Sequence, residues 1–165
     1  MASRILIAGI GNIFLGDDGF GVAVARRMLA RGQRKGVRVV DFGIRGFDLA
    51  YALQDGYETT ILVDAYPHGQ KPGAVSIVEP DLNQLDESDA TGFVQPHAMS
   101  PLNVLRMAKT MNGSLKRVLL VGCEPLTLGG DEGNMDLSDV VAAAVDTAVK
   151  EIELVVNRIL DRQES

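Results

Sequence analysis

The chain has little of several features that mark particular classes of protein. A single cysteine, Cys123, excludes a disulfide within the chain and fits a reducing compartment. No apolar run approaches the roughly 18 residues that a membrane-spanning helix needs, and the first residues lack a signal-peptide pattern. We therefore expect a cytoplasmic protein with no membrane partner.

Positive charge is also scarce. Sixteen basic residues stand against 22 acidic ones, which gives a net charge of −6. A nucleic-acid-binding domain would need a basic face, so no nucleic-acid partner is expected, and a cation or a basic peptide is favoured instead. The length of 165 residues fits one domain, expected to span residues 1–165. Nothing in the sequence indicates the oligomeric state.

Short apolar runs of strand length alternate with segments of helical periodicity. This alternation predicts a three-layer α/β fold, in which a mainly parallel sheet has helices on both faces. Two segments that fit neither pattern, Glu79–Pro96 and Pro125–Asp136, are expected to be loops. The expected strands are Arg4–Ala8, Val37–Asp41, Thr59–Asp64, Ala74–Val78 and Arg117–Gly122, and the expected helices are Gly19–Leu29, Phe47–Gln54, residues 101–111 after an N-cap at Ser100, and a C-terminal helix through Val141–Ile159 after an N-cap at Ser138.

The segment Ile5–Gly19 is the most informative part of the sequence. An apolar strand leads into the closely spaced glycines Gly9 and Gly11, and two carboxylates, Asp17 and Asp18, precede a helix. A strand, a glycine-rich turn and a helix start usually bind phosphate, because exposed amides favour anions. Adjacent carboxylates would repel a pyrophosphate and suit a cation instead. Each of them could also simply stabilise the positive end of the following helix.

Other polar residues follow the later strands. Asp41 closes the second expected strand, Asp64 closes the third, and His97 precedes the helix that starts near Ser100. In parallel sheets ligands bind at the carboxyl ends of the strands, so Asp18, Asp64 and His97 could meet there. Two carboxylates and one imidazole suit a divalent ion such as nickel or zinc. Taken singly, Asp64 could be a turn former and His97 a structural or exposed histidine.

Two further residues that could take part in catalysis are expected to have no catalytic role. Cys123 ends a strand beside Glu124, whose charge would raise the pKa of the thiol, so we expect a buried packing residue rather than a nucleophile. His68 lies in a proline- and glycine-containing turn and is expected to be solvated.

At these residues the chain resembles the hydrogenase maturation endopeptidases, which trim the large subunit of nickel–iron hydrogenases. The resemblance covers most of the chain, and the ordered set of motifs is more specific than any one of them. The motifs are Gly9-Ile10-Gly11-Asn12 with Asp17-Asp18-Gly19, Asp41-Phe42-Gly43, Leu62-Val63-Asp64-Ala65, Pro96-His97, and Leu120-Val121-Gly122 before Glu124-Pro125.

The resemblance implies a five-stranded twisted sheet between helices, which agrees with the strand count above. It implies that Asp18, Asp64 and His97 bind nickel, with Asp18 where the family often has glutamate, and that Asp41 contributes to cleavage. All four residues are thus candidate catalytic residues of an aspartyl-type peptidase. The family often has threonine where this chain has Ile44.

The implied reaction is removal of a C-terminal extension from a [NiFe]-hydrogenase large-subunit precursor that already carries its nickel. The nickel would then be presented by the substrate. Two alternatives stay open at this stage. One is a nucleotide-binding protein that uses the Gly9–Gly11 turn, and the other is a non-catalytic chaperone that senses nickel during assembly.

Overall fold

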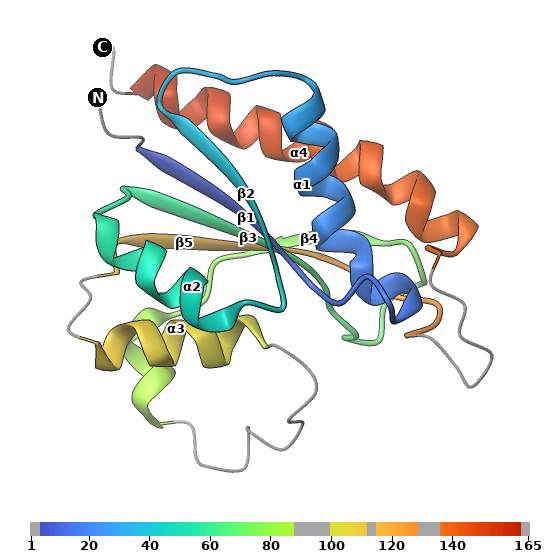
Figure 1. The fold of residues 1–165 in the computed structure, drawn as a ribbon, viewed down its shortest axis with the longest axis horizontal. Coiled ribbons are helices and arrows are strands. Elements are labelled where there is room, and N and C mark those ends of the chain that lie inside the picture. The colour runs from blue at the N-terminus through green and yellow to red at the C-terminus, as the bar shows by residue number, and fades with distance from the viewer. Residues whose placement is uncertain (1–3, 88–99, 112–114, 129–135, 163–165) are drawn as a thin grey trace.

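A computed structural model describes residues 4–87, 100–111, 115–128 and 136–162 (Figure 1). Within them the chain forms a five-stranded sheet and four α-helices, as the sequence predicts. The strands are β1 (Ile5–Ile10), β2 (Val37–Gly43), β3 (Thr59–Ala65), β4 (Val75–Val78) and β5 (Arg117–Cys123), and the helices are α1 (Phe20–Ala30), α2 (Gly46–Ala52), α3 (Pro101–Thr110) and α4 (Asp139–Arg162). Three short 3-10 helices accompany them: η1 (Gly16–Gly19), η2 (Leu53–Asp55) and η3 (Leu82–Glu87).

The sheet is mainly parallel. Its strand order is β2-β1-β3-β5-β4, and only β4 runs antiparallel to its neighbour. The chain passes from β1 outward to β2 and then returns to the other side of β1 to form β3. The strand order therefore reverses between β1 and β3, which is where open α/β sheets bind their ligands.

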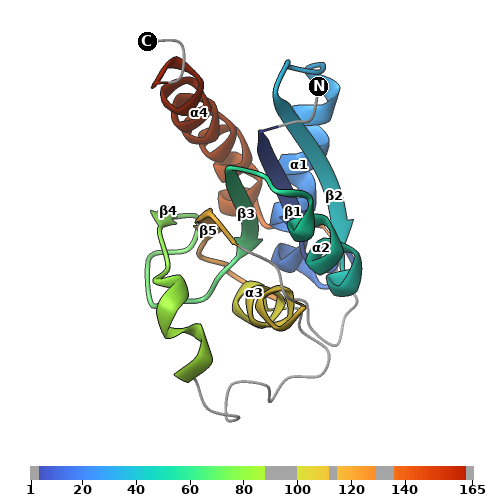
Figure 2. The same ribbon diagram turned by 90° about the vertical axis from the view of Figure 1, so that its left-hand side faces the viewer.

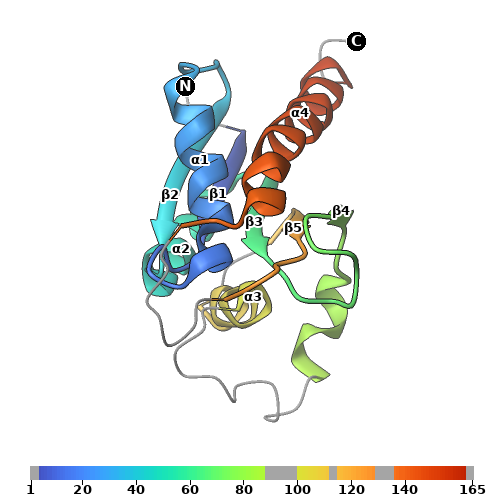
Figure 3. The ribbon, with the colours of Figure 1, turned by 90° about the vertical axis from the view of Figure 1, so that its right-hand side faces the viewer.

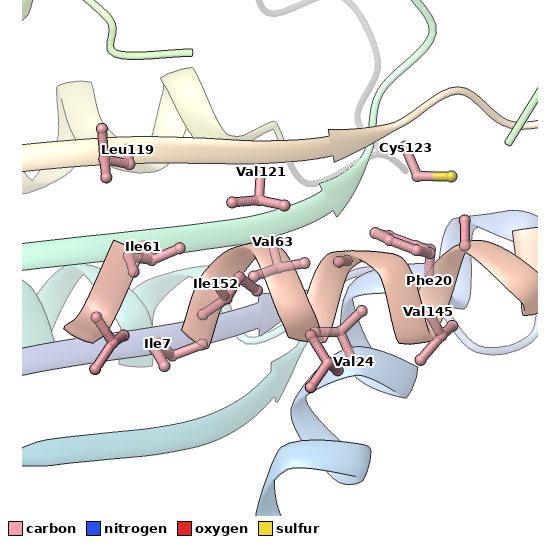
Figure 4. Packing of buried hydrophobic residues seen from close by; sticks show 14 of the residues in the cluster. Ile7, Phe20, Val24, Ile61, Val63, Leu119, Val121, Cys123, Val145 and Ile152 are labelled. Carbon is pink, nitrogen blue, oxygen red and sulfur yellow. The ribbon is translucent and has the colours of Figure 1, made fainter. Parts of the chain in front are cut away.

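Helices cover both faces of the sheet (Figures 1 and 2). Helices α1 and α4 lie side by side on one face (Figure 3), and α2 and α3 lie on the other. On the first face, strand residues such as Ile7, Ile61 and Val121 pack against Val24 of α1 and Ile152 of α4 (Figure 4). The central strands are buried on both faces, which explains why β1 and β3 read as continuous apolar runs.

Two glycines allow α1 to lie very close to the sheet. A Cβ atom on Gly21 would lie 2.0 Å from the carbonyl oxygen of Val63, and one on Gly9 would lie 2.3 Å from that of Gly21. Backbone atoms in a packed sheet and helix cannot shift enough to relieve such short distances, so both positions require glycine. The close packing of α1 thus explains why residue 9 is glycine, without any phosphate site at the turn.

One local expectation needs correction, and the two expected N-caps are confirmed in position. The segment Glu79–Pro96 is not loop throughout, because Leu82–Glu87 forms η3, supported by the Asp81 carboxylate accepting from the Asn83 amide at 2.9 Å. Ser100 does precede α3, but its hydroxyl makes no capping hydrogen bond. Ser138 directly precedes α4, its carbonyl accepts from the Ala142 amide at 2.8 Å, and its hydroxyl donates to Asp17. None of the helices in the described part of the chain is long and apolar enough to cross a membrane.

Candidate active site at the carboxyl edge of the sheet

Asp64 lies at the reversal point of the sheet, near the carboxyl end of β3. It shares a strand face with Leu62, on the side of α2 and α3, while Val63 and Ala65 face α1 and α4. The residue is only 7% exposed, and its Oδ1 atom is buried with no hydrogen-bond partner among the residues that the structure describes. A buried carboxylate oxygen with no donor is costly, so this atom needs a proton or a cation.

The electrostatics of Asp64 agree with that need. Burial raises its pKa well above the usual range, and the nearby negative charge of Asp18 raises it further. A backbone hydrogen bond from Ala65 only partly offsets these effects. The folded protein thus disfavours the ionised form of Asp64 unless positive charge is supplied from outside the chain.

Asp18 is the second acid of the site. It lies on η1, and its Oδ2 accepts a hydrogen bond from the Asn12 amide at 2.7 Å. Burial raises its pKa and this hydrogen bond partly lowers it again. Gly11 separates the two acids: a Cβ there would lie 1.9 Å from the Asp18 carbonyl oxygen and 3.6 Å from Asp64 Oδ1. The predicted meeting of Asp18 and Asp64 is therefore observed.

A cavity of about 190 Å³ extends from Asp64 along the α3 side of the sheet. Its walls include Ser76 of β4, Gly122 of β5, Pro101 at the start of α3 and Ser100, which precedes that helix. His97, the third predicted ligand, lies outside the described residues, three positions before Ser100. Within the described ranges no three His, Cys, Asp or Glu side chains gather as a complete metal site.

Asp17 has a different function from its neighbour. It is fully buried and faces the loop after β5, where its carboxylate accepts hydrogen bonds from the amides of Leu126, Thr127 and Ser138 and from the Ser138 hydroxyl, at 2.6–3.0 Å. Burial alone would raise its pKa, but these hydrogen bonds outweigh burial and lower it. Asp17 therefore ties η1 to the start of α4, and both of its buried oxygens are engaged within the chain.

Asp41 does not join the pair formed by Asp18 and Asp64. It lies on β2 on the same face as Val39, toward α1, whereas Asp64 lies on the opposite face. Its Oδ2 atom is 3.3 Å from Nε of Arg26 on α1. The structure therefore places this candidate catalytic residue at a second location, two strands from β3.

The glycine-rich turn is poorly suited to phosphate. A phosphate site needs free backbone amides, but the Asn12 amide donates to Asp18 and the Gly11 amide donates to the Gly43 carbonyl at 2.9 Å. Four further amides of this turn also donate within the chain, those of Phe14, Leu15, Asp17 and Asp18. The geometry thus disfavours the nucleotide-binding alternative.

A buried network behind the site escaped the sequence reasoning. The Glu124 carboxylate accepts from the His68 amide at 2.7 Å and lies 3.0 Å from Nδ1 of the same residue. The His68 ring also stacks on Tyr66, and its side chain is 20% exposed, so it is less solvated than expected. Burial raises the pKa of Cys123 to about 11, helped by the charges of Asp17 and Glu124, which confirms an unreactive thiol. In the sequence, this network was indicated only by the position of Glu124, an acid directly after β5.

Two carboxylates held in this way can do two things chemically. They can share a proton, or they can bind a cation whose charge replaces the missing donor. An ion held by two carboxylates would keep open coordination positions for ligands from another molecule. Such a pair is suited to recognising a cation that arrives already bound elsewhere.

Comparisons with known proteins give a consistent result. The family model of the hydrogenase maturation proteases (HycI) matches residues 22–154. The hydrogenase expression/formation protein HupD of Rhizobium leguminosarum bv. viciae is 33% identical over 152 residues, covering 90% of this chain and 74% of that protein. Among solved structures, a hydrogenase 2 maturation peptidase from a Thaumarchaeota archaeon is 30% identical with a TM-score of 0.71, covering 94% of this chain and 99% of that one. The hydrogenase maturating endopeptidase HybD of E. coli shares the fold, with a TM-score of 0.75 at 24% identity, covering 94% and 93% of the two chains.

Proposed function

This chain belongs to the hydrogenase maturation protease family, and we propose that it removes the C-terminal extension of a nickel-loaded [NiFe]-hydrogenase large-subunit precursor. In this proposal Asp18, Asp64 and His97 recognise the nickel that the substrate carries. The reaction is hydrolysis of one peptide bond in a protein partner.

The observation that carries the proposal is the partnerless Oδ1 atom of Asp64 beside Asp18. In the free protein the two acids have only backbone donors, from Asn12 and Ala65, and no cationic side chain of the described residues offsets the charge that they would carry when both are ionised. A nickel ion on the substrate would supply the positive charge, and carboxylate oxygens with an imidazole nitrogen are suitable ligands for it. A precursor without nickel offers no such compensation, so the same pair would discriminate against it.

His97 completes the proposed ligand set. Ser100 and Pro101, which follow it by three and four positions, line the cavity that contains Asp64. A neutral imidazole adds a ligand without adding charge, so the set carries two negative charges at most. Together these ligands would bind a free ion only modestly, and binding would depend on the remaining ligands from the precursor.

Asp41 has a separate part in the proposal. Because it lies on the opposite face of the sheet from Asp64, its contribution to cleavage is contact with the substrate polypeptide rather than with nickel. The Arg26 guanidinium holds its carboxylate in place. In this proposal the acid pair recognises the nickel, and Asp41 helps to position the bound precursor polypeptide.

The proposal is tested by mixing the protein with nickel-loaded and nickel-free precursor and measuring intact masses. We expect only the loaded precursor to lose a C-terminal peptide, and we expect His97→Ala to stop this loss while leaving the circular dichroism spectrum unchanged. A complex that forms without any change of mass would instead support the nickel-sensing chaperone. Cleavage of both forms of the precursor alike would contradict nickel recognition.

A further inference from the structure

Exposed apolar side chains surround the acid pair. Each parallel strand is followed by one: Phe14 after β1, Ile44 after β2, Tyr66 after β3 and Leu126 after β5, with exposed fractions of 64%, 62%, 49% and 60%. Single exposed apolar residues are ordinary, but a group at one edge of a sheet indicates an interaction surface. This edge is where the acid pair lies.

Two of these residues, Phe14 and Ile44, line a groove of about 330 Å³ between the loops that follow β1 and β2. The groove adjoins the acid pair, because Gly11 and Asn12 also line it. Gly11 abuts Asp64 Oδ1, and the Asn12 amide donates to Asp18. A polypeptide lying in the groove would therefore run directly to the site where we place the nickel.

The charges in the groove wall are already neutralised within the chain. Arg26 pairs with Asp41, and Arg45 pairs with Asp48 at 3.4 Å. Arg45 also donates to the Asp41 carbonyl at 2.5 Å and lies over the Phe42 ring. The bond from Arg45 also occupies the Asp41 carbonyl, near the end of the edge strand β2. The groove offers apolar contacts and no spare charge, and its complement is an uncharged apolar segment.

We propose that this groove binds an uncharged, apolar stretch of the precursor polypeptide next to the cleaved bond, with Phe14 and Ile44 as its main contacts. The inference rests on the proposed function and adds the chemistry of the bound segment. Ile44 is 62% exposed and lines the groove, so this position would help to select the precursor that carries a matching apolar side chain.

The test is steady-state cleavage of nickel-loaded precursor by the Phe14→Ser/Ile44→Ser variant. We expect KM to rise at least about tenfold with kcat changed less than about threefold, because a ground-state contact is lost and the acid pair is untouched. The control is Leu29→Ser/Leu154→Ser, which removes two apolar residues of similar exposure from helices α1 and α4 and should leave both constants unchanged.

Charged variants test the neutrality of the bound segment. Ile44→Asp and Ile44→Lys should both raise KM, whereas a fall in KM for either would show that the segment carries the opposite charge and would overturn the proposal. An unchanged KM in the double serine variant would also overturn it. So would sedimentation showing that the wild type is a dimer and this variant a monomer, because the groove would then bind a second copy. Failure of the wild type to cleave would refute the proposed function instead.

Discussion

Asp64→Asn is expected to abolish cleavage and to make the fold more stable at neutral pH. If Asp64 binds nickel as proposed, its loss should reduce kcat/KM by at least about 100-fold, since even the groups that merely support metal ligands contribute 10- to 100-fold. The same change removes a buried charge without a donor, which should raise the free energy of unfolding by about 1–3 kcal/mol. Urea denaturation and the precursor mass assay measure the two effects.

The stability gain of Asp64→Asn should depend on pH with a definite sign. The pKa of Asp64 is raised in the folded protein, so the unfolded chain releases this proton first as pH increases. Wild-type stability therefore falls above about pH 3.9, the ordinary value for aspartate, until the folded form ionises as well. The variant should gain most at neutral pH and nothing below about pH 3. A variant less stable than wild type at pH 7 would contradict the uncompensated charge.

Asp17→Asn should strongly destabilise the fold, whereas the same change at the next residue, Asp18→Asn, should leave stability nearly unchanged and abolish cleavage. Asp17 accepts four hydrogen bonds from Leu126, Thr127 and Ser138. Asparagine would direct an amide toward those donors, so we expect a loss of about 3–5 kcal/mol in the free energy of unfolding. Because total stabilities are about 5–15 kcal/mol, this loss would remove between about a fifth and all of the stability, and we expect a clear fall in the midpoint of urea denaturation.

Asp18→Asn is the matched control for this prediction. It should change the free energy of unfolding by less than about 1 kcal/mol while abolishing cleavage. The low pKa of Asp17 also predicts that its stabilisation is complete above about pH 3.9 and is lost as pH falls below that value. Equal stability losses for the two variants, measured in urea, would show that the assignment of structural and ligand roles is wrong.

The elements of the fold were predictable because their signals are local. Buried parallel strands such as Ile5–Ile10 read as continuous apolar runs, and α4 carries apolar residues at three- and four-residue spacing. The meeting of Asp18 and Asp64 was also predictable, since both follow strands that end at one edge of the sheet. The resemblance to the family supplied nickel as the expected ligand, which the residues alone left open.

What the sequence could not give depends on contacts between distant residues. Asp17 and Asp18 look equivalent in the sequence, and only the loop that folds back from Leu126 makes one structural. The alternation along β2 groups Asp41 with Val39, but it does not say which helices cover that face. The packing of Glu124 under His68 likewise joins residues 56 positions apart.

The central claim is that the acid pair recognises nickel carried by the substrate. It is tested most directly by measuring the affinity of the protein for nickel-loaded and nickel-free precursor, with wild type and with Asp64→Asn. We predict that nickel strengthens binding to the wild type by at least about tenfold, and that this preference disappears in the variant. A preference for the nickel-loaded form that is retained in full by Asp64→Asn would contradict the claim.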